Sequence, residues 1–395
     1  MAGWKAMIFK LAFKNILGYG WRSLINVFII ALVLIGLIWM EGMWFSWLNL
    51  AKTQSTQWEF GGGLLRVKSY DPYDVFALEH SHAPIPAQAG NLVASGEIVP
   101  VLFSPAVIYP GGRMQNAVVK GIPSQQSLLR FPSQALMPTE ANPYPAIVGK
   151  TMAKSAQLQE GDAFTIRVKD SSGAFNAVDL QISQIMDCPV PSLDQGTVWM
   201  DLQALQDLKQ LPGMATTLAL RDQSLASVAS PEFKLIPPNE FFADLNQMVK
   251  TKASGQASLF VMMIFLAMLA IFDTQALAIF KRRREIGMLS ALGMTKARII
   301  LLFTTEGALY MLGATVLTAV MGFPLFWYFA RIGFSLPKGY DSFGVAGFNE
   351  ALKFVYPLPL ILFTLMLMFL LTVFVSWLPA RKIARLMPTE ALRGK

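Results

Sequence analysis

Four long apolar runs interrupt a chain whose other segments mix apolar and polar positions as globular proteins do. The runs cover residues 23–40, 258–280, 299–330 and 354–380. About 20 apolar helical residues, each rising about 1.5 Å, cross a hydrocarbon core about 30 Å thick. Each run therefore predicts a membrane-spanning helix.

The first run could alternatively be a secretory signal peptide, which is short and ends at a small-residue cleavage site. This run instead ends among the bulky Trp39, Met40, Trp44 and Phe45, and no small-residue pattern follows it promptly. We therefore interpret it as the first of four spans.

The segment between the first two spans, residues 45–256, reads as ordinary globular sequence. Residues 163–168 and 178–185 alternate as strands do, whereas residues 151–158 and 202–209 have helical spacing. A segment of about 210 residues can bury a core of its own. We predict an α/β domain here, and the pattern does not give its topology.

Basic residues predict the orientation of the spans, because segments rich in lysine and arginine stay in the cytosol. The segments before the first span, between the second and third, and after the fourth hold 15 basic and two acidic residues. We therefore predict that both termini are cytosolic. The domains are then residues 1–44, with an interfacial helix and the first span, residues 45–256 outside the cytosol, and residues 257–395 with the other spans.

The composition indicates a chain that meets both lipid and water. Hydrophobic residues make up 54% of it and charged residues only 15%, against about 25% charged in soluble proteins. The formal net charge is +8, made up of +13 in the segments predicted to be cytosolic and −5 in the rest of the chain, and the basic segments favour contact with anionic membrane lipid. We expect no nucleic-acid partner.

A short pattern in the predicted domain imitates a phosphate-binding loop. Gly149, Lys150 and Thr151 look like the end of that motif, but Tyr144 stands where the motif needs a glycine. We therefore reject nucleotide binding by this chain.

Candidates for metal or nucleophile chemistry are equally weak. Glu79, His80 and His82 are more typical of a solvated loop than of a metal site. Cys188 is the only cysteine, and we expect it to be a buried small hydrophobe. We find no catalytic motif in a convincing sequence context, so we expect no enzymatic activity, no metal and no cofactor in this chain.

The segment between the second and third spans is the most informative part of the chain. Basic residues at positions 281–284 end the second span at the interface. Beyond them, Ile286, Leu289 and Leu292 with Gly293 fall at helical spacing on one face. Such an apolar face either rests on the membrane or docks in the groove of a partner.

Two charged residues, Asp273 and Glu306, lie within the predicted spans. A charge in lipid is unfavourable by a few kcal/mol, so each should face a neighbouring helix or water. Asp273 is either a hinge or subunit contact or a polar cap near the interface, and Glu306 can pair with a basic neighbour. Elsewhere in the third span, small residues recur every four positions, which indicates close helix packing, within the chain or at a dimer interface: Ala314, Thr318 and Gly322.

Residues 283–295, RREIGMLSALGMT, resemble the signature of FtsX-type ABC transporter permeases. Residues 379–393, PARKIARLMPTEALR, resemble the C-terminal signature of that family, and Glu306 stands at one of its recurrent positions. Within the predicted domain, residues 119–123 and 147–154 resemble the MacB-type periplasmic core domain. The resemblance covers essentially the whole chain.

The resemblance implies a polytopic α-helical protein of the bacterial inner membrane, with four spans in a 1+3 arrangement and an inserted extracytoplasmic α/β domain of MacB periplasmic-core type. It implies that a separate ABC ATPase dimer binds ATP and Mg²⁺, and that a second permease copy completes a homo- or heterodimer. The implied ATPase-coupling residues are Arg284, Glu285, Ile286, Gly287, Leu289, Leu292 and Gly293.

Within this family the chain most resembles the lipoprotein-releasing (LolC/LolE-like) permeases, through residues 36–44 and 62–72. Such a permease would draw lipoprotein from the outer leaflet of the inner membrane. An aromatic group would then contact acyl chains or, alternatively, form an interfacial belt: Trp39, Trp44, Phe45 and Trp47. MacB-like export of peptides or small molecules and an FtsX-like signal relay to an extracytoplasmic partner are the alternative functions.

Overall fold

The computed structural model describes residues 2–18, 20–71, 74, 77–334 and 352–383. The chain divides into a helical unit and a β-rich unit, of which the β-rich unit holds Asn49–Met248. The helices α2, Trp21–Ser55, and α8, Ala243–Lys281, run without a break through these limits. The division therefore falls within continuous helices, and the predicted limits at residues 44 and 257 lie in the same two helices.

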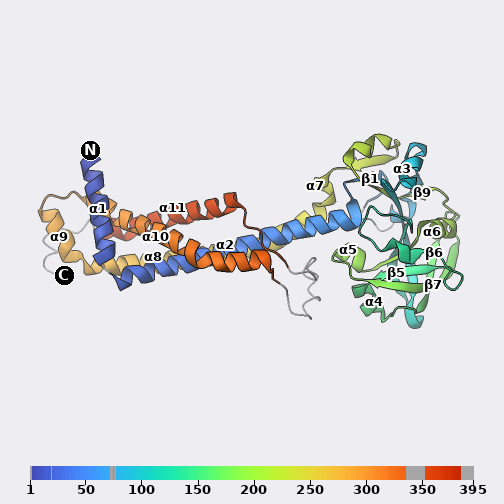
Figure 1. The fold of residues 1–395 in the computed structure, drawn as a ribbon, viewed down its shortest axis with the longest axis horizontal. Coiled ribbons are helices and arrows are strands. Elements are labelled where there is room, and N and C mark those ends of the chain that lie inside the picture. The colour runs from blue at the N-terminus through green and yellow to red at the C-terminus, as the bar shows by residue number, and fades with distance from the viewer. Residues whose placement is uncertain (1, 19, 72–73, 75–76, 335–351, 384–395) are drawn as a thin grey trace. The chain divides into compact units, whose positions relative to one another are not determined.

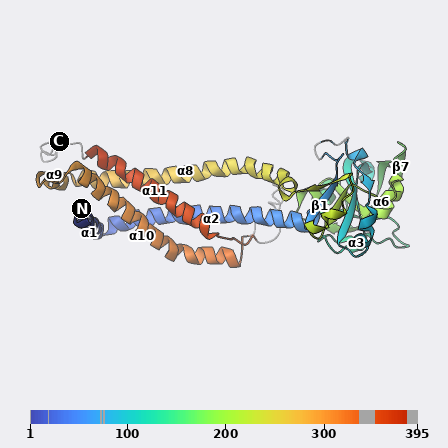
Figure 2. The ribbon, with the colours of Figure 1, turned by 90° about the horizontal axis from the view of Figure 1, so that it is seen from above.

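The helical unit contains the apolar runs (Figures 1 and 2). Among the described residues, four helices are long and apolar enough to cross a membrane: Ser23–Phe60, Ala257–Lys281, Lys296–Arg331 and Leu358–Lys382. The third and fourth of these are α10, Lys296–Arg331, and α11, Leu358–Ile383. Two shorter helices are also described in this unit, namely α1, Ala2–Gly18, and α9, Arg283–Ala291.

Three of the long helices differ from the predicted apolar runs in length or starting point. With 35 residues, α2 is about 52 Å long, which exceeds the hydrocarbon core, and α8 with 39 residues is longer still. The fourth span begins at Leu358 instead of residue 354. Pro357 explains this difference, because the residue that precedes a proline, here Tyr356, avoids the helical conformation.

Close packing within the helical unit uses small residues. Gly307 on α10 lies against Ser376 on α11, where an added Cβ would come within 2.6 Å of the serine Cβ. Ala314 and Thr318 are buried, and the Thr318 hydroxyl donates to the carbonyl oxygen of Ala31 on α2 at 3.3 Å. This part of the predicted small-residue stripe therefore packs inside the chain.

The core of the β-rich unit is a closed β-barrel. Strands β3, β4, β8, β5, β7 and β6 pair in that order, and β6 also pairs with β3, which closes the ring. The pairs β4–β8 and β5–β7 are parallel, and the other pairs are antiparallel. The barrel strands are β3, Ile98–Tyr109; β4, Gln115–Ile122; β5, Pro145–Gly149; β6, Ala163–Lys169; β7, Phe175–Met186; and β8, Thr197–Asp201.

Strand β3 belongs to two sheets because it is 12 residues long. Its first half pairs with β10, Thr217–Leu220, which continues to β1, Gly63–Val67, and β11, Phe233–Ile236. A separate two-stranded sheet joins β2, Ala83–Pro84, to β9, Met214–Ala215.

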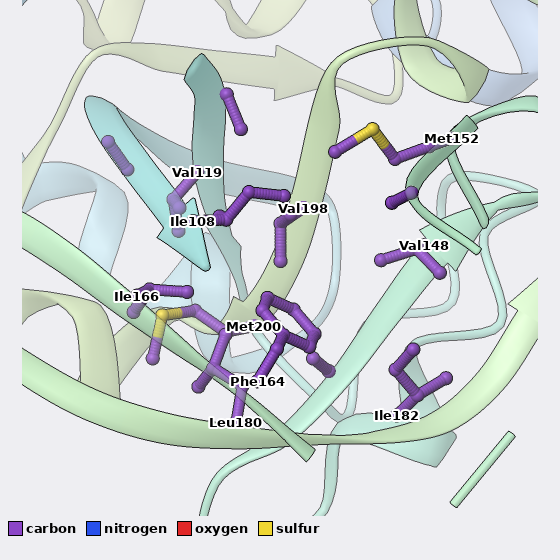
Figure 3. Close-up of a cluster of buried hydrophobic side chains, with 14 of the residues drawn as sticks. Ile108, Val119, Val148, Met152, Phe164, Ile166, Leu180, Ile182, Val198 and Met200 are labelled. Atoms are coloured by element: carbon purple, nitrogen blue, oxygen red, sulfur yellow. The ribbon is translucent and has the colours of Figure 1, made fainter. Parts of the chain in front are cut away.

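Side chains fill the barrel interior, as Figure 3 shows for Ile108, Phe164 and Met200. The helices of the β-rich unit are short, so the domain predicted as α/β is dominated by strands. They are α3, Gly90–Ala94; α4, Lys150–Ala156; α5, Pro191–Asp194; α6, Leu202–Lys209; and α7, Pro238–Phe241.

Candidate functional site

The bend between α8 and α10 is formed by α9, which lies beside α1 at one end of the helical unit (Figures 1 and 2). Helix α9 ends in two reverse hydrogen bonds, from the Met294 amide to the Leu289 carbonyl at 2.9 Å and from the Gly293 amide to the Ser290 carbonyl at 3.1 Å. Gly293 has a φ of +87°, which glycine adopts without steric cost. The sequence of the bend thus defines its geometry locally.

A buried ion pair anchors this bend to the third span. Arg282, at the break between α8 and α9, donates from Nη1 to both carboxylate oxygens of Glu306 on α10, at 2.9 and 3.1 Å. The side chains of Arg282 and Glu306 are only 7% and 5% exposed. Because each charge is removed from water, each depends on the other for compensation. The expectation of a basic partner for Glu306 is confirmed.

Two further groups complete the network around the ion pair. Asn15 on α1 donates from Nδ2 to Glu306 Oε1 at 2.7 Å. The Arg282 Nε donates to Glu285 Oε2 on α9 at 2.8 Å, and the guanidinium carbon lies 5.1 Å from the centre of the Phe303 ring. We call Asn15, Arg282, Glu285 and Glu306 the joint network. It connects α1, α9 and α10.

The predicted apolar face of α9 is partly buried within the helical unit and partly exposed. Ile286 is buried beside Ile299 and Phe303, and Leu289 packs partly against α1 and α10. An Ile286 contact with a partner or with lipid is therefore excluded in this conformation, because its own helices cover it. Leu292 remains 85% exposed, and Met288, which the sequence analysis did not single out, is 54% exposed.

The remaining predicted coupling residues also separate by burial. Gly287 is buried, whereas Arg284, Glu285 and Gly293 are exposed. The outward surface of the bend is thus a mixture of Met288, Leu292 and charged side chains.

The two charged residues predicted within the spans have different surroundings. Asp273 is exposed on α8, and Glu306 is buried in the joint network. A third acidic residue lies in α2 just beyond the predicted run, where Glu41 accepts a hydrogen bond from the Thr364 hydroxyl at 2.7 Å. Glu41 was not predicted, because it lies one residue beyond the apolar run that ends at residue 40.

The predicted aromatic group is packed within the chain. The Trp39 ring lies 5.8 Å from Phe329 and 5.6 Å from Phe354, between centroids. Trp44 and Trp47 are 4.9 Å apart and Trp47 is buried, while Phe45 is partly buried. The structure therefore brings Trp44 and Trp47 together and places Trp39 in a different aromatic cluster.

In the β-rich unit, the segment that resembles a phosphate-binding loop and the candidate metal ligand Glu79 both contact side chains of the protein itself. The Thr151 amide, where a phosphate would bind, donates to the carboxylate of Asp194 at 3.1 Å. The Glu79 carboxylate lies 2.7 Å from the Lys169 ammonium, which lowers the pKa of Glu79. Both carboxylates therefore serve internal contacts.

Cys188 is buried, as predicted, and burial raises the pKa of its thiol to about 12. The thiolate is the reactive form, so we expect native Cys188 to react with maleimide at pH 7.5 at least about a thousandfold more slowly than a free thiol. Mass spectrometry before and after unfolding measures this. Rapid labelling of the folded chain would contradict the burial.

This chain is similar to known proteins both in its C-terminal segment and over most of its length. Residues 257–388 match the family model described as FtsX-like permease C-terminal. An alignment of 321 residues relates this chain to the lipoprotein-releasing system transmembrane protein LolC of Xylella fastidiosa, strain Temecula1, with 20% identity. The alignment covers 74% of this chain and 76% of that protein. The LolC protein of strain 9a5c matches to the same extent. The joint network lies partly within the matched family segment, at Arg282, Glu285 and Glu306.

Proposed function

We propose that this chain, an FtsX-like ABC transporter permease, transmits the motion of a separate ATPase dimer to its β-rich domain outside the cytosol, and so releases lipoprotein from the outer leaflet of the bacterial inner membrane. ATP and Mg²⁺ bind to that ATPase, and a second permease copy completes the complex. The termini and α9 lie in the cytosol. The fold supports this proposal because the described residues combine four apolar helices with a large separate domain.

The observation that carries the proposal is the anchored bend of α9. Met288 and Leu292 present an outward apolar surface, and the joint network ties the same bend to α1 and α10. An ATPase that binds this surface would move α10 directly, because the ion pair resists separation. Exposed apolar residues at helical spacing suit docking in a partner's groove.

The route to the β-rich domain would follow the long helix α2. Its π-helical continuation, Thr56–Phe60, buries Trp58 in the core of that domain, and Glu59 lies 3.6 Å from the ammonium of Lys120. Phe60 stacks on Phe241, with ring centroids 5.1 Å apart. These contacts would convert a displacement of the helix into a displacement of the domain.

Lipoprotein is the favoured substrate because the chain is similar to LolC proteins, whose name describes a lipoprotein-releasing system. The aromatic residues of α2 would receive the acyl chains, and the β-rich unit would be a domain of MacB periplasmic-core type. Export of peptides or small molecules and a signal relay are the alternatives. Acylated protein that co-purifies with the complex supports release, whereas an outer-membrane channel supports export and a cell-wall hydrolase supports the relay.

We expect Leu292→Asp, and likewise Met288→Asp, to abolish stimulation of the ATPase while the chain still inserts in the membrane. A charge on the exposed apolar surface would oppose docking, and neither side chain supports the fold. Gly287 and Leu289 are less suitable targets, because a buried or half-buried aspartate would also destabilise the bend. ATP hydrolysis by the co-purified complex is the measurement.

The control for these variants is Met114→Asp, because Met114 is a methionine of the β-rich unit that is 71% exposed, between Met288 and Leu292 in exposure. It should leave ATPase stimulation unchanged. Normal ATPase stimulation in both α9 variants would contradict the assignment of this surface as the docking site. Failure of the wild-type chain to bind an ATPase would contradict it as well.

Orientation is tested by cysteine labelling of intact spheroplasts. We expect an impermeant maleimide to modify Ser171→Cys, in the β-rich unit, and not Ser290→Cys, in α9. Native Cys188 is buried and gives little background. The reverse labelling pattern would place α9 outside the cytosol and end the proposal.

A further inference from the structure

Helix α1 has three distinct faces. At about 100° per residue, Ile8, Ala12 and Asn15 share one face, which packs on α10 and the joint network. The other two faces point away from the fold and differ in chemistry. One is apolar, with Phe9, Phe13 and Leu17, and the other is basic, with Lys10 and Lys14.

The apolar face is large and would be unfavourable in water. Phe9, Phe13 and Leu17 are each more than half exposed and form one continuous stripe. Burial of such a stripe in the headgroup and acyl boundary of a bilayer is the arrangement of an interfacial helix. Helix α1 packs on the membrane-spanning α10, so a lipid surface is adjacent to it.

The basic face identifies the kind of lipid. Lys10 and Lys14 are four residues apart, so their ammonium groups extend on the same side of α1, next to the apolar stripe. Lysines beside an inserted apolar stripe lie at the level of the headgroups. Charge complementarity therefore favours anionic headgroups on the cytosolic surface.

We propose that α1 binds anionic lipid through Lys10 and Lys14, and that this lipid sets the strength of ATPase coupling through the Asn15–Glu306 contact. The inference rests on the proposed function for its coupling step, and the binding step is independent of any ATPase. A lipid that holds α1 in place fixes Asn15 against Glu306, 2.7 Å away, and thereby stiffens the bend at α9.

Native mass spectrometry of the purified full chain tests the binding step, with phosphatidylglycerol and phosphatidylcholine as probes. We expect the wild-type chain to retain phosphatidylglycerol preferentially. The double variant Lys10→Gln, Lys14→Gln should lose this retention by about fivefold for each lysine. The matched control is Lys150→Gln, Lys154→Gln, an exposed pair with the same spacing on α4, and it should retain the lipid.

The coupling step is tested in nanodiscs that contain the complex with its ATPase. We expect phosphatidylglycerol to raise ATPase stimulation in the wild-type complex but not in Asn15→Leu, which should still bind the lipid. Equal ATPase stimulation with both lipids overturns the coupling step.

The binding step is overturned if both double lysine variants lose lipid equally, or if the α1 double variant loses none. If the α1 pair weakens ATPase binding or permease association instead, a protein covers this face and the inference is wrong. Failure of the wild-type chain to bind any ATPase would instead reject the proposed function.

Discussion

Replacement of Arg282 by alanine is expected to destabilise the helical unit by about 3 to 5 kcal/mol. The variant leaves the Glu306 carboxylate buried without its cation, and within the described part of the chain only the Asn15 amide still donates to it. Thermal unfolding of the purified chain in detergent measures the loss. ATPase stimulation should fall as well, because the bend at α9 is no longer anchored to α10.

Two control variants separate the buried ion pair from the exposed one. Glu285→Ala removes the pair between Arg282 and a carboxylate that is 53% exposed, and it should have an effect of only about 1 kcal/mol or less. The double variant Arg282→Met, Glu306→Leu removes both buried charges together and should recover most of the lost stability. A double variant as unstable as Arg282→Ala would show that the loss does not come from an unpaired charge.

Phe164→Ala is expected to destabilise the β-rich unit by about 3 to 5 kcal/mol, because it opens a cavity in the barrel interior. Phe164 is 3% exposed and packs among Ile166, Leu180 and Met200 (Figure 3). Urea unfolding of the full-length chain in detergent, followed by hydrogen exchange of the barrel strands, measures the effect, because the nine tryptophans of the chain do not report on this unit alone.

The matched control is Phe175→Ala on the adjacent strand β7, where the side chain is 62% exposed. This variant loses little buried area and should change the free energy of unfolding by less than about 1 kcal/mol. Equal losses in the two variants would contradict the assignment of Phe164 to the interior of a closed barrel.

Helix α1 shows how tertiary contacts hide a sequence pattern. Residues 1–19 have no clean amphipathic face when all apolar positions are counted together. Once Ile8 and Ala12 are assigned to the contact with α10, the remaining apolar residues form a separate stripe. The sequence predicted a helix here, and it did not predict three faces because the contact with α10 is non-local.

The sequence predicted the position of the bend at α9, but it did not predict which of its apolar residues are exposed. Helical spacing placed Ile286 and Leu292 on one apolar face. The structure buries Ile286 against the helices of its own chain and leaves Leu292 exposed. Spacing reports which residues share a face, and it does not report what covers that face.

The spans and the existence of a separate domain followed from the sequence alone, because the requirement for about 20 apolar residues in a bilayer is local and strong. The limits of α4 and α6 were also nearly predicted, since helical spacing and turn-forming residues act over a few positions. The closure of the barrel between β3 and β6, the choice of Arg282 as the partner of Glu306, and the contact of Asn15 with Glu306 were decided only by the tertiary structure. Each of these contacts joins residues far apart in the chain, and their formation depends on the packing of whole helices and strands, which no short segment of sequence encodes.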